Sequence, residues 1–353
     1  MKIFIIHSYY PEFLKGFYEK NPNLKSSSYK EQKSALIKEQ FGTADFYSKN
    51  LSPLGHTAEE FIINNEVLQK QWAKENNIQY SDNIFKSNWL EKIVEAQILQ
   101  FKPDVVYSHN LKIVSLESLD RIKKMTKILV GQIASPLPDE NFLKKYDLIL
   151  SSFPHYVQRF KELGIAGDYF NLGFEESILS TLRKTKDQYD TVFIGTLGGK
   201  HTKGLDIFEY ISNHIKLDLW GPDSYITKNY HGEAWGHEMF NILYNSKIAI
   251  NRHIDVAENY ANNMRLYEAT GSGTMLITDA KPNLNDLFEA GKEVETYSSK
   301  EELLKKIEYY LIHDDERKAI AQAGQKRTFR DHTYRVRMVQ LVQILERYLN
   351  KNV

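Results

Sequence analysis

Short apolar runs with strand character alternate with helical patterns along almost the whole chain. The first half contains the runs KIFIIH (2–7), AEEFIINN (58–65), DVVYSHN (104–110), KILVGQIA (127–134) and DLILSS (147–152). The second half restarts the series with TVFIG (191–195), LDLWG (217–221), KIAIN (247–251) and TMLITD (274–279). Because strands that alternate with helices form parallel sheets covered by helices, this order predicts an α/β fold.

Helical patterns occupy the intervals between the strand-like runs. The clearest cover residues 65–75, 88–101, 154–164 and about 235–244, and a helix-rich tail follows from Lys300. Residues 11–54 form a long polar segment with helical character from about Tyr29. The spacing of apolar and polar residues in these stretches is typical of helices packed on a sheet.

A polar and charged stretch, residues 175–190, lacks a core pattern and separates two strand–helix series. We therefore expect two doubly wound, Rossmann-like domains facing a cleft. The first covers residues 1–178 and the second residues 179–332, and a final helix covers 333–353. In such folds ligands bind at the carboxyl ends of the strands.

The charge balance and the absence of cysteine limit the classes of function. Lys and Arg total 46, as do Asp and Glu, so no overall charge attracts nucleic acid or an anionic membrane. With 0 cysteines the chain forms neither disulfides nor thiolate metal sites. The N-terminal apolar run is too short for a signal peptide, and no stretch is long enough to cross a bilayer. We expect a cytoplasmic protein without a transmembrane segment.

The stretch NNMRLYEATGSGTMLITD (262–279) carries the clearest candidate binding residues. Asn262 or Asn263 can cap a helix whose free N–H groups attract phosphate. Arg265 and Glu268 lie three residues apart, on one face of that helix. The arginine suits a diphosphate, and the carboxylate suits the paired hydroxyls of a ribose.

The glycines of this stretch allow close approach of backbone or ligand. Gly271 and Gly273 let the chain turn from the helix into the following strand. The alternative is purely structural: Arg265 and Glu268 form a surface ion pair, and the glycines end the helix.

The second half of the chain resembles the nucleotide-sugar domain of GT-B glycosyltransferases. The resemblance is to the group-1-like family that includes spore-maturation-protein-like (CgeB-type) members. The similar pieces lie within about residues 190–340: TVFIGTLGGKHTKGLDIFEYI, LDLWGPD, NILYNSKIAINRH, NNMRLYEATGSGTMLITD and the stretch from LFEAGKEVETYSS to RVRM. The first half resembles the family in its strand–helix order and in pieces such as KPDVVYSHN. In this family the last helix returns to the first domain.

The resemblance implies roles for residues of the helix at 262–271. Glu268 matches the second glutamate of the E-x7-E motif, which holds the nucleotide ribose. Arg265 matches the arginine that precedes this glutamate in the spore-maturation-like branch, and Asn263 lies at the helix start. The first glutamate of the motif falls on Tyr260, so the donor sugar and the stereochemistry stay open.

Further donor-binding residues follow the strands of the second half. The resemblance places Gly195 where backbone approaches the donor, Lys200 and Lys203 near the diphosphate, and Trp220 and Gly221 near the nucleobase. The structural alternatives are a turn at the glycines, solvated lysines and a buried strand-end aromatic residue.

Asn251, Arg252 and His253 follow KIAI, so they should face the cleft if that strand is central. Helix capping is the alternative role of Asn251.

The first half supplies the candidate base or acceptor-orienting group. His109 matches the second histidine of the PDVVHAH pattern of group-1 enzymes, and His7 follows the first strand, where some inverting enzymes carry their base. The pKa of histidine lies near neutrality, which suits this role. His56 lies at the opposite end of its strand. Gln132 occupies a position where related retaining enzymes carry a histidine.

Taken together, the sequence predicts a metal-independent, hexosyltransferase-like glycosyltransferase. It would move a sugar from a UDP- or GDP-sugar donor to a hydroxyl of a saccharide, lipid-linked or small-molecule acceptor, in polysaccharide, glycolipid or glycoside assembly. No Asp-x-Asp triplet or clustered metal ligands accompany these motifs, so no cofactor and no metal site is expected. The alternatives are an epimerase of nucleotide sugars and a binding protein that has lost catalysis.

Overall fold

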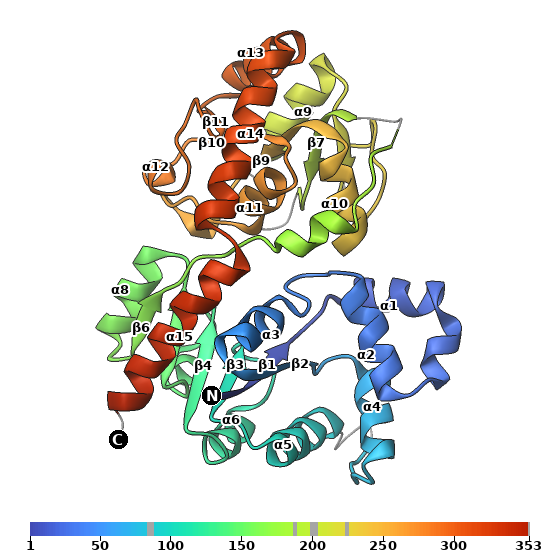
Figure 1. The fold of residues 1–353 in the computed structure, drawn as a ribbon, viewed down its shortest axis with the longest axis vertical. Coiled ribbons are helices and arrows are strands. Elements are labelled where there is room, and N and C mark those ends of the chain that lie inside the picture. The colour runs from blue at the N-terminus through green and yellow to red at the C-terminus, as the bar shows by residue number, and fades with distance from the viewer. Residues whose placement is uncertain (83–87, 186–188, 198–203, 223–225, 352–353) are drawn as a thin grey trace. The chain divides into compact units, whose positions relative to one another are not determined.

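The structure, a computed structural model, describes residues 1–82, 88–185, 189–197, 204–222 and 226–351. It divides into two compact units. The first contains Met1–Phe170 and Met338–Val353, and the second contains Asn171–Arg337. In each unit, strands are surrounded by helices (Figure 1), as the alternating sequence pattern predicts.

The first unit contains a six-stranded sheet in the order β2-β1-β3-β4-β5-β6. All neighbouring strands are parallel. The strands are β1 (Lys2–His7), β2 (Thr57–Ile62), β3 (Val105–Ser108), β4 (Ile128–Gln132), β5 (Leu148–Ser151) and β6 (Gly167–Tyr169). Ile3 to His7 of β1 are all buried. Burial on both faces explains why β1 is a continuous apolar run rather than an alternating one.

Helices of the first unit cover more of the polar segment at 11–54 than its composition predicts. The helices are α1 (Pro11–Lys20), α2 (Tyr29–Lys38), α3 (Phe46–Leu51), α4 (Glu66–Glu75), α5 (Trp89–Phe101), α6 (Leu116–Lys123), α7 (Glu140–Leu143), α8 (Pro154–Glu162) and α15 (Tyr334–Lys351), with 3-10 turns η1 (Pro22–Ser26) and η2 (Ser52–Leu54). Helix α1 starts on Pro11, which has no N–H to leave unpaired, and buries Phe13 and Phe17. Ser28 and Glu31 form a capping box at the start of α2.

The second unit contains a five-stranded parallel sheet in the order β11-β10-β9-β7-β8. Its strands are β7 (Tyr189–Ile194), β8 (Asp218–Trp220), β9 (Ser246–Asn251), β10 (Met275–Asp279) and β11 (Glu295–Tyr297). Its helices are α9 (Leu205–His214), α10 (Gly236–Tyr244), α11 (Met264–Gly271), α12 (Leu284–Leu287), α13 (Lys300–Ile312) and α14 (Asp314–Asp331), with 3-10 turns η3 (Glu176–Ser180) and η5 (Asp255–Ala257). In both sheets the chain begins in a central strand and reverses its direction of travel there, which is a doubly wound topology.

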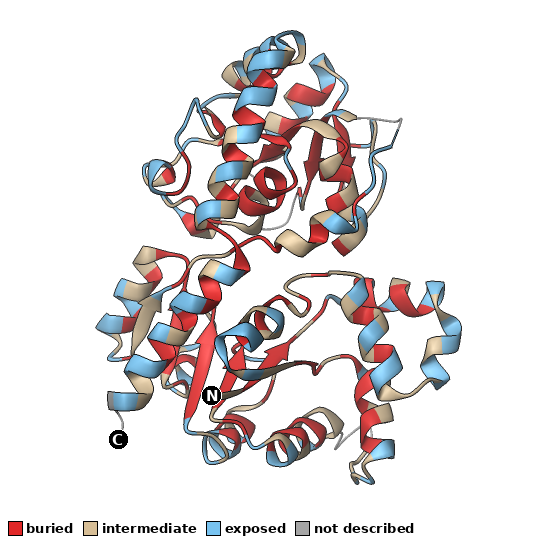
Figure 2. Cartoon of the chain, viewed as in Figure 1, coloured by how far each residue is buried: buried red, intermediate tan, exposed pale blue. Residues whose placement is uncertain are grey.

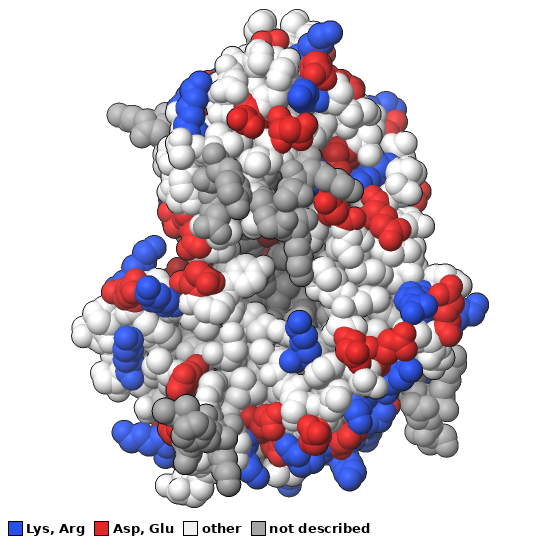
Figure 3. Space-filling view, turned by 180° about the vertical axis from the view of Figure 1, so that it is seen from behind, with Lys and Arg blue, Asp and Glu red and all other residues white. Residues whose placement is uncertain are grey.

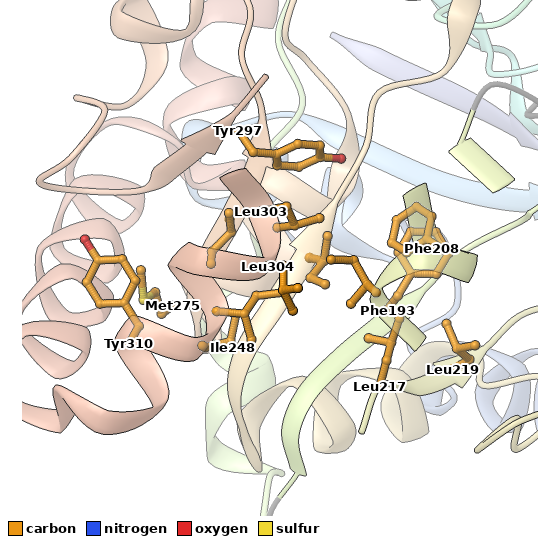
Figure 4. Close-up of a cluster of buried hydrophobic side chains, with 14 of the residues drawn as sticks. Phe193, Phe208, Leu217, Leu219, Ile248, Met275, Tyr297, Leu303, Leu304 and Tyr310 are labelled. Atoms are coloured by element: carbon orange, nitrogen blue, oxygen red, sulfur yellow. The ribbon is translucent and has the colours of Figure 1, made fainter. Parts of the chain in front are cut away.

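The core of the second unit joins its strands to α9 and α13. Phe193 of β7 lies against Phe208 of α9, with ring centroids 4.0 Å apart. Leu303 of α13 and Ile248 of β9 belong to the same buried cluster (Figure 4). Buried residues are concentrated on the strands and on the helix faces turned toward them (Figure 2).

The division between the units falls after Phe170 rather than after residue 178. Phe174 explains the difference, because its N–H donates to the His332 carbonyl and its own carbonyl accepts from Tyr334 N–H, each at 2.9 Å. From Met338 onward α15 belongs to the first unit, where Arg347 forms an ion pair with Asp168.

Charged side chains of both signs are mixed on the surface. Figure 3 shows Lys and Arg interspersed with Asp and Glu on one face, in keeping with the equal totals in the sequence. Within the described ranges, every helix is too short or too polar to cross a bilayer.

Candidate functional site

A pocket of about 300 Å³ opens at the carboxyl edge of the second sheet. It lies where the chain order reverses, between β7 and β9, the position at which doubly wound sheets bind ligands. Its walls come from the ends of β7 and β9 and from the first turns of α11. The lining residues include Gly195, Asn251, Asn263, Arg265 and Glu268, all expected from the sequence, together with Arg252.

Two asparagines join the end of β9 to the start of α11. Asn263 caps α11, and its side-chain oxygen accepts from Leu266 N–H at 3.3 Å. Its Nδ2 donates to Asn251 Oδ1 at 2.9 Å, and Asn251 Nδ2 donates to Thr278 Oγ1 of β10 at 2.9 Å. Asn251 therefore ties the cap of α11 to two neighbouring strands, in addition to lining the pocket.

Arg265 and Glu268 form an ion pair inside the pocket wall. Arg265 Nη1 lies 3.0 Å from Glu268 Oε2, and the two side chains are 14% and 8% exposed. This burial excludes the alternative of a solvated surface pair. Arg265 Nη2 also donates to the Ile194 carbonyl at 3.1 Å, so the arginine connects α11 to the end of β7.

Burial raises the pKa of the Glu268 carboxyl, and the positive charge of Arg265 opposes this rise. A buried carboxylate held by a single arginine has spare acceptor capacity, because each oxygen has two lone pairs. Glu268 is therefore placed to accept hydrogen bonds from hydroxyl groups of a ligand in the pocket.

Gly195 and Gly221 bring the ends of β7 and β8 into close contact. Gly195 N–H donates to the Trp220 carbonyl at 2.9 Å. A Cβ atom on Gly221 would lie 2.1 Å from the Gly195 carbonyl oxygen, so a side chain has no room there. Gly221 thus supports the backbone at Gly195, which lines the pocket.

Trp220 lies outside the lining of this pocket. It is buried, stacks on His231 with ring centroids 4.5 Å apart, and contacts Tyr189 edge-on. The indentation that Trp220 and Gly221 do line is too small to hold a water molecule. Lys200 and Lys203 lie outside the described residues.

The first unit brings His7 and His109 together at the carboxyl edge of its own sheet. The rings stack with centroids 4.6 Å apart and planes 11° apart. Both Nε2 atoms are buried without a hydrogen-bond partner among the described residues. Burial lowers the pKa of His109 to about 3, and burial together with His109 and Lys33 lowers the pKa of His7. Both rings are therefore neutral near pH 7, and His109 is a weak base.

Gln132 holds the aromatic residues that surround His109. The hydroxyls of Tyr47 and Tyr107 both donate to Gln132 Oε1, at 2.8 and 2.7 Å. Both rings meet His109 edge-on, at 4.9 and 5.3 Å between centroids. This glutamine orients neighbours of the histidine pair.

Of the two residues that were expected to face the cleft beside Asn251, Arg252 lines the pocket, whereas His253 is buried and lies outside its lining. The sequence assigned no role to Asp279, the partner of His253. Asp279 Oδ1 accepts from both His253 N–H, at 2.9 Å, and His253 Nδ1, at 2.7 Å. Burial would raise the pKa of Asp279, but the bonds from His253 hold it below its usual value. The position of Arg252 directly after Asn251 was a usable signal, whereas the Asp279 contact arises only from strand pairing. Among the described residues, no group of three or more His, Asp or Glu is arranged to hold a metal ion.

Residues 205–343 match the family model described as "Glycosyl transferase-like". No curated protein matches the chain. Among solved structures, a glycosyltransferase from Rickettsia africae is similar at 12% identity and a TM-score of 0.61, over 99% of this chain and 98% of that one.

Two further solved structures are similar over almost their full lengths. Sucrose-phosphate synthase from Thermosynechococcus elongatus matches at 11% identity and a TM-score of 0.60, over 99% of this chain and 100% of that one. HepE from Anabaena, solved in complex with UDP-glucose, matches at 11% identity and a TM-score of 0.60, over 98% and 99%. The chain thus has the GT-B fold, and the predicted fold class is confirmed.

Proposed function

We propose that this protein is a glycosyltransferase that transfers a sugar from a nucleoside-diphosphate sugar to a hydroxyl acceptor. The observation that carries the proposal is the pocket at the reversal point of the second sheet, with the buried Glu268 in its wall. The glycosyl transferase-like match over residues 205–343 covers most of this pocket. HepE, which shares the fold, was solved with UDP-glucose.

In this proposal the pocket binds the nucleotide part of the donor. Glu268 accepts hydrogen bonds from the ribose hydroxyls, most strongly in its ionised form, in which both oxygens are acceptors. The backbone at Gly195 and the capped start of α11 at Asn263 approach the donor closely. Arg265 balances the charge of Glu268, and Arg252 adds positive charge for the leaving diphosphate, so the donor reacts without a required metal ion.

The reaction breaks the bond between the sugar C1 and the diphosphate oxygen and forms a bond from C1 to the acceptor oxygen. The diphosphate leaves with the bonding electrons, and the acceptor hydroxyl passes its proton to an oxygen of the departing diphosphate. On the first unit, His109 and His7 are the proposed contacts for the acceptor. A pKa of about 3 suits His109 to orienting a hydroxyl by hydrogen bonding better than to removing its proton.

The finer parts of the proposal follow the sequence resemblance. We propose a member of the spore-maturation-protein-like branch, with a UDP- or GDP-sugar as donor and a saccharide, lipid-linked or small-molecule acceptor. Its product would enter polysaccharide, glycolipid or glycoside assembly. Because Tyr260 stands at the position of the first motif glutamate, the resemblance does not identify the donor sugar.

Binding of UDP and GDP to wild type and to Glu268→Gln tests the pocket by calorimetry. The variant keeps the shape of the side chain but loses charge-assisted hydrogen bonds, so we expect a tenfold to hundredfold loss of affinity, on the order of 1.5–3 kcal/mol. Glu308→Gln, an exposed position on α13, is the matched control. Equal affinity of wild type and Glu268→Gln would contradict this nucleotide site.

Turnover tests the reaction class. Incubation of UDP- and GDP-sugars with a panel of hydroxyl acceptors should release nucleoside diphosphate only when an acceptor is present. Donor isomerisation without an acceptor would favour an epimerase. Binding without turnover over the whole panel would favour a protein that has lost catalysis.

A further inference from the structure

The two arginines that line the pocket differ in what already binds them. Arg265 Nη1 contacts Glu268 Oε2 at 3.0 Å and Met239 Sδ at 3.1 Å, and Nη2 donates to the Ile194 carbonyl at 3.1 Å. Its partners thus come from α11, α10 and the end of β7. Releasing the Arg265 head group toward a ligand would leave the buried Glu268 without its counter-charge, which is costly.

Among the described residues, Arg252 is bound by its own loop alone. Its Nη2 donates to Asp255 Oδ1 at 3.0 Å and its Nη1 to the His253 carbonyl at 3.4 Å. Asp255 is 31% exposed, so water weakens this ion pair and can solvate the carboxylate if the arginine turns away. The Arg252 side chain also runs past Gly204, where an added Cβ would meet its Cδ at 3.0 Å.

The residues on both sides of Arg252 are held by hydrogen bonds to neighbouring elements. Asn251 is bonded to Asn263 and Thr278, and His253 is bonded twice to Asp279. The His253 side chain is fully buried. A weakly paired guanidinium can turn toward an anion without breaking a strong ion pair, and the fixed neighbours limit the ordering cost to the arginine side chain itself.

We propose that Arg252 contacts the diphosphate of the donor and that Arg265 is a positioning residue that holds Glu268 against the end of β7. This inference rests on the proposed nucleotide site and assigns different roles to its two arginines. The planar guanidinium of Arg252 matches two phosphate oxygens. Arg265 affects ribose binding indirectly, because it holds the Glu268 carboxylate in position.

The test compares diphosphate and nucleoside binding. Affinities for UDP and uridine, and for GDP and guanosine, are measured by calorimetry and saturation-transfer NMR for wild type, Arg252→Gln, Arg265→Gln and Arg330→Gln. The last is the control, since Arg330 is an exposed arginine paired with Asp331 at 2.8 Å. Circular dichroism of each variant checks that it is folded.

We expect Arg252→Gln to weaken binding of the diphosphate at least tenfold and to leave nucleoside binding unchanged. Arg265→Gln should weaken both by similar factors, and Arg252→Lys should recover part of the lost diphosphate affinity. Arg265 opposes the rise in the pKa of Glu268, so removing Arg265 should raise this pKa further. As the pH is lowered, the nucleoside affinity of Arg265→Gln should therefore begin to fall at a higher pH than that of wild type.

Two results would overturn the inference. One is a ratio of diphosphate to nucleoside affinity that Arg252→Gln leaves unchanged. The other is a ratio that collapses in Arg265→Gln, with the pH dependence of nucleoside binding unaltered. Failure of wild type to bind either diphosphate or nucleoside would instead contradict the proposed function itself.

Discussion

Glu60 on β2 is a buried carboxyl whose surroundings favour its neutral form. Burial raises its pKa to about 7, although Ser48 donates to it from N–H at 2.9 Å and from Oγ at 2.6 Å. Lys33 opposes the rise, and Asp45 adds to it. Between the ordinary value of 4.5 and about 7, the folded protein keeps a proton that the unfolded chain has lost.

The free energy of unfolding of the first unit should therefore fall as the pH rises through this window, by roughly 3 kcal/mol in total. Glu60→Gln should remove this dependence and be more stable than wild type at pH 8. Urea unfolding at several pH values, followed by hydrogen exchange of β2 peptides, measures the effect. Glu19→Gln on α1 is the exposed control, and a wild-type stability that is flat between pH 5 and 7 would refute the prediction.

The stacked histidines give a second prediction at the level of residues. With a pKa of about 3, the His109 imidazole should stay neutral from pH 8 down to pH 5, and the lowered pKa of His7 favours its neutral form as well. Nitrogen chemical shifts of labelled histidine report the charge directly. Exposed His214 on α9 serves as a reference side chain in the same spectra. Protonation of His109 near pH 6 would contradict this prediction and would make His109 a candidate base again.

At the level of elements, the contact between the ends of β7 and β8 depends on the absence of a side chain at Gly221. Gly221→Ala would place a Cβ 2.1 Å from the Gly195 carbonyl oxygen, so backbone must move. We expect a loss of about 1–3 kcal/mol in stability and weaker nucleotide binding, because Gly195 lines the pocket.

Gly16→Ala on α1 is the matched substitution, since its Cβ would meet no atom within 4 Å. Within a helix this change should stabilise the protein by about 0.5–1 kcal/mol. Thermal unfolding of both variants gives the comparison. Equal melting temperatures for Gly221→Ala and wild type would show that the strand ends can separate without cost.

At the level of the whole molecule, the chain returns to its first unit at the end. Leu341 and Leu345 of α15 are fully buried, whereas Val339 on the same helix is 41% exposed. Leu341→Ala should cost about 2–5 kcal/mol, and Val339→Ala should cost far less. Hydrogen exchange should show the loss of protection in residues 1–170 and leave the peptides of the second unit unchanged. Loss of protection in the second unit instead would contradict this assignment.

The sequence predicted the long elements well, because their signals are local. A continuous apolar run such as 2–7 and the Asn cap at the start of α11 can be recognised from a few consecutive residues, without knowledge of tertiary contacts. The three-residue edge strands β6 and β11 were not predicted, because GDY and ETY are too short to carry a periodic pattern. Helix α1 was not predicted either, because it lies in a segment whose overall composition is polar.

For the candidate site, local patterns in the sequence are enough to predict which residues stand at a strand end and at the start of α11. The strand before Asn251 and the helix period at 262–271 gave Asn251, Asn263, Arg265 and Glu268, and the family resemblance added Gly195; all five line the pocket. The tertiary structure alone decided which partner each side chain meets. Arg265 is occupied by Glu268 and Ile194, Trp220 stacks on His231, and His253 meets Asp279. Such contacts join residues brought close by strand pairing and packing, and no local pattern in the chain encodes that proximity.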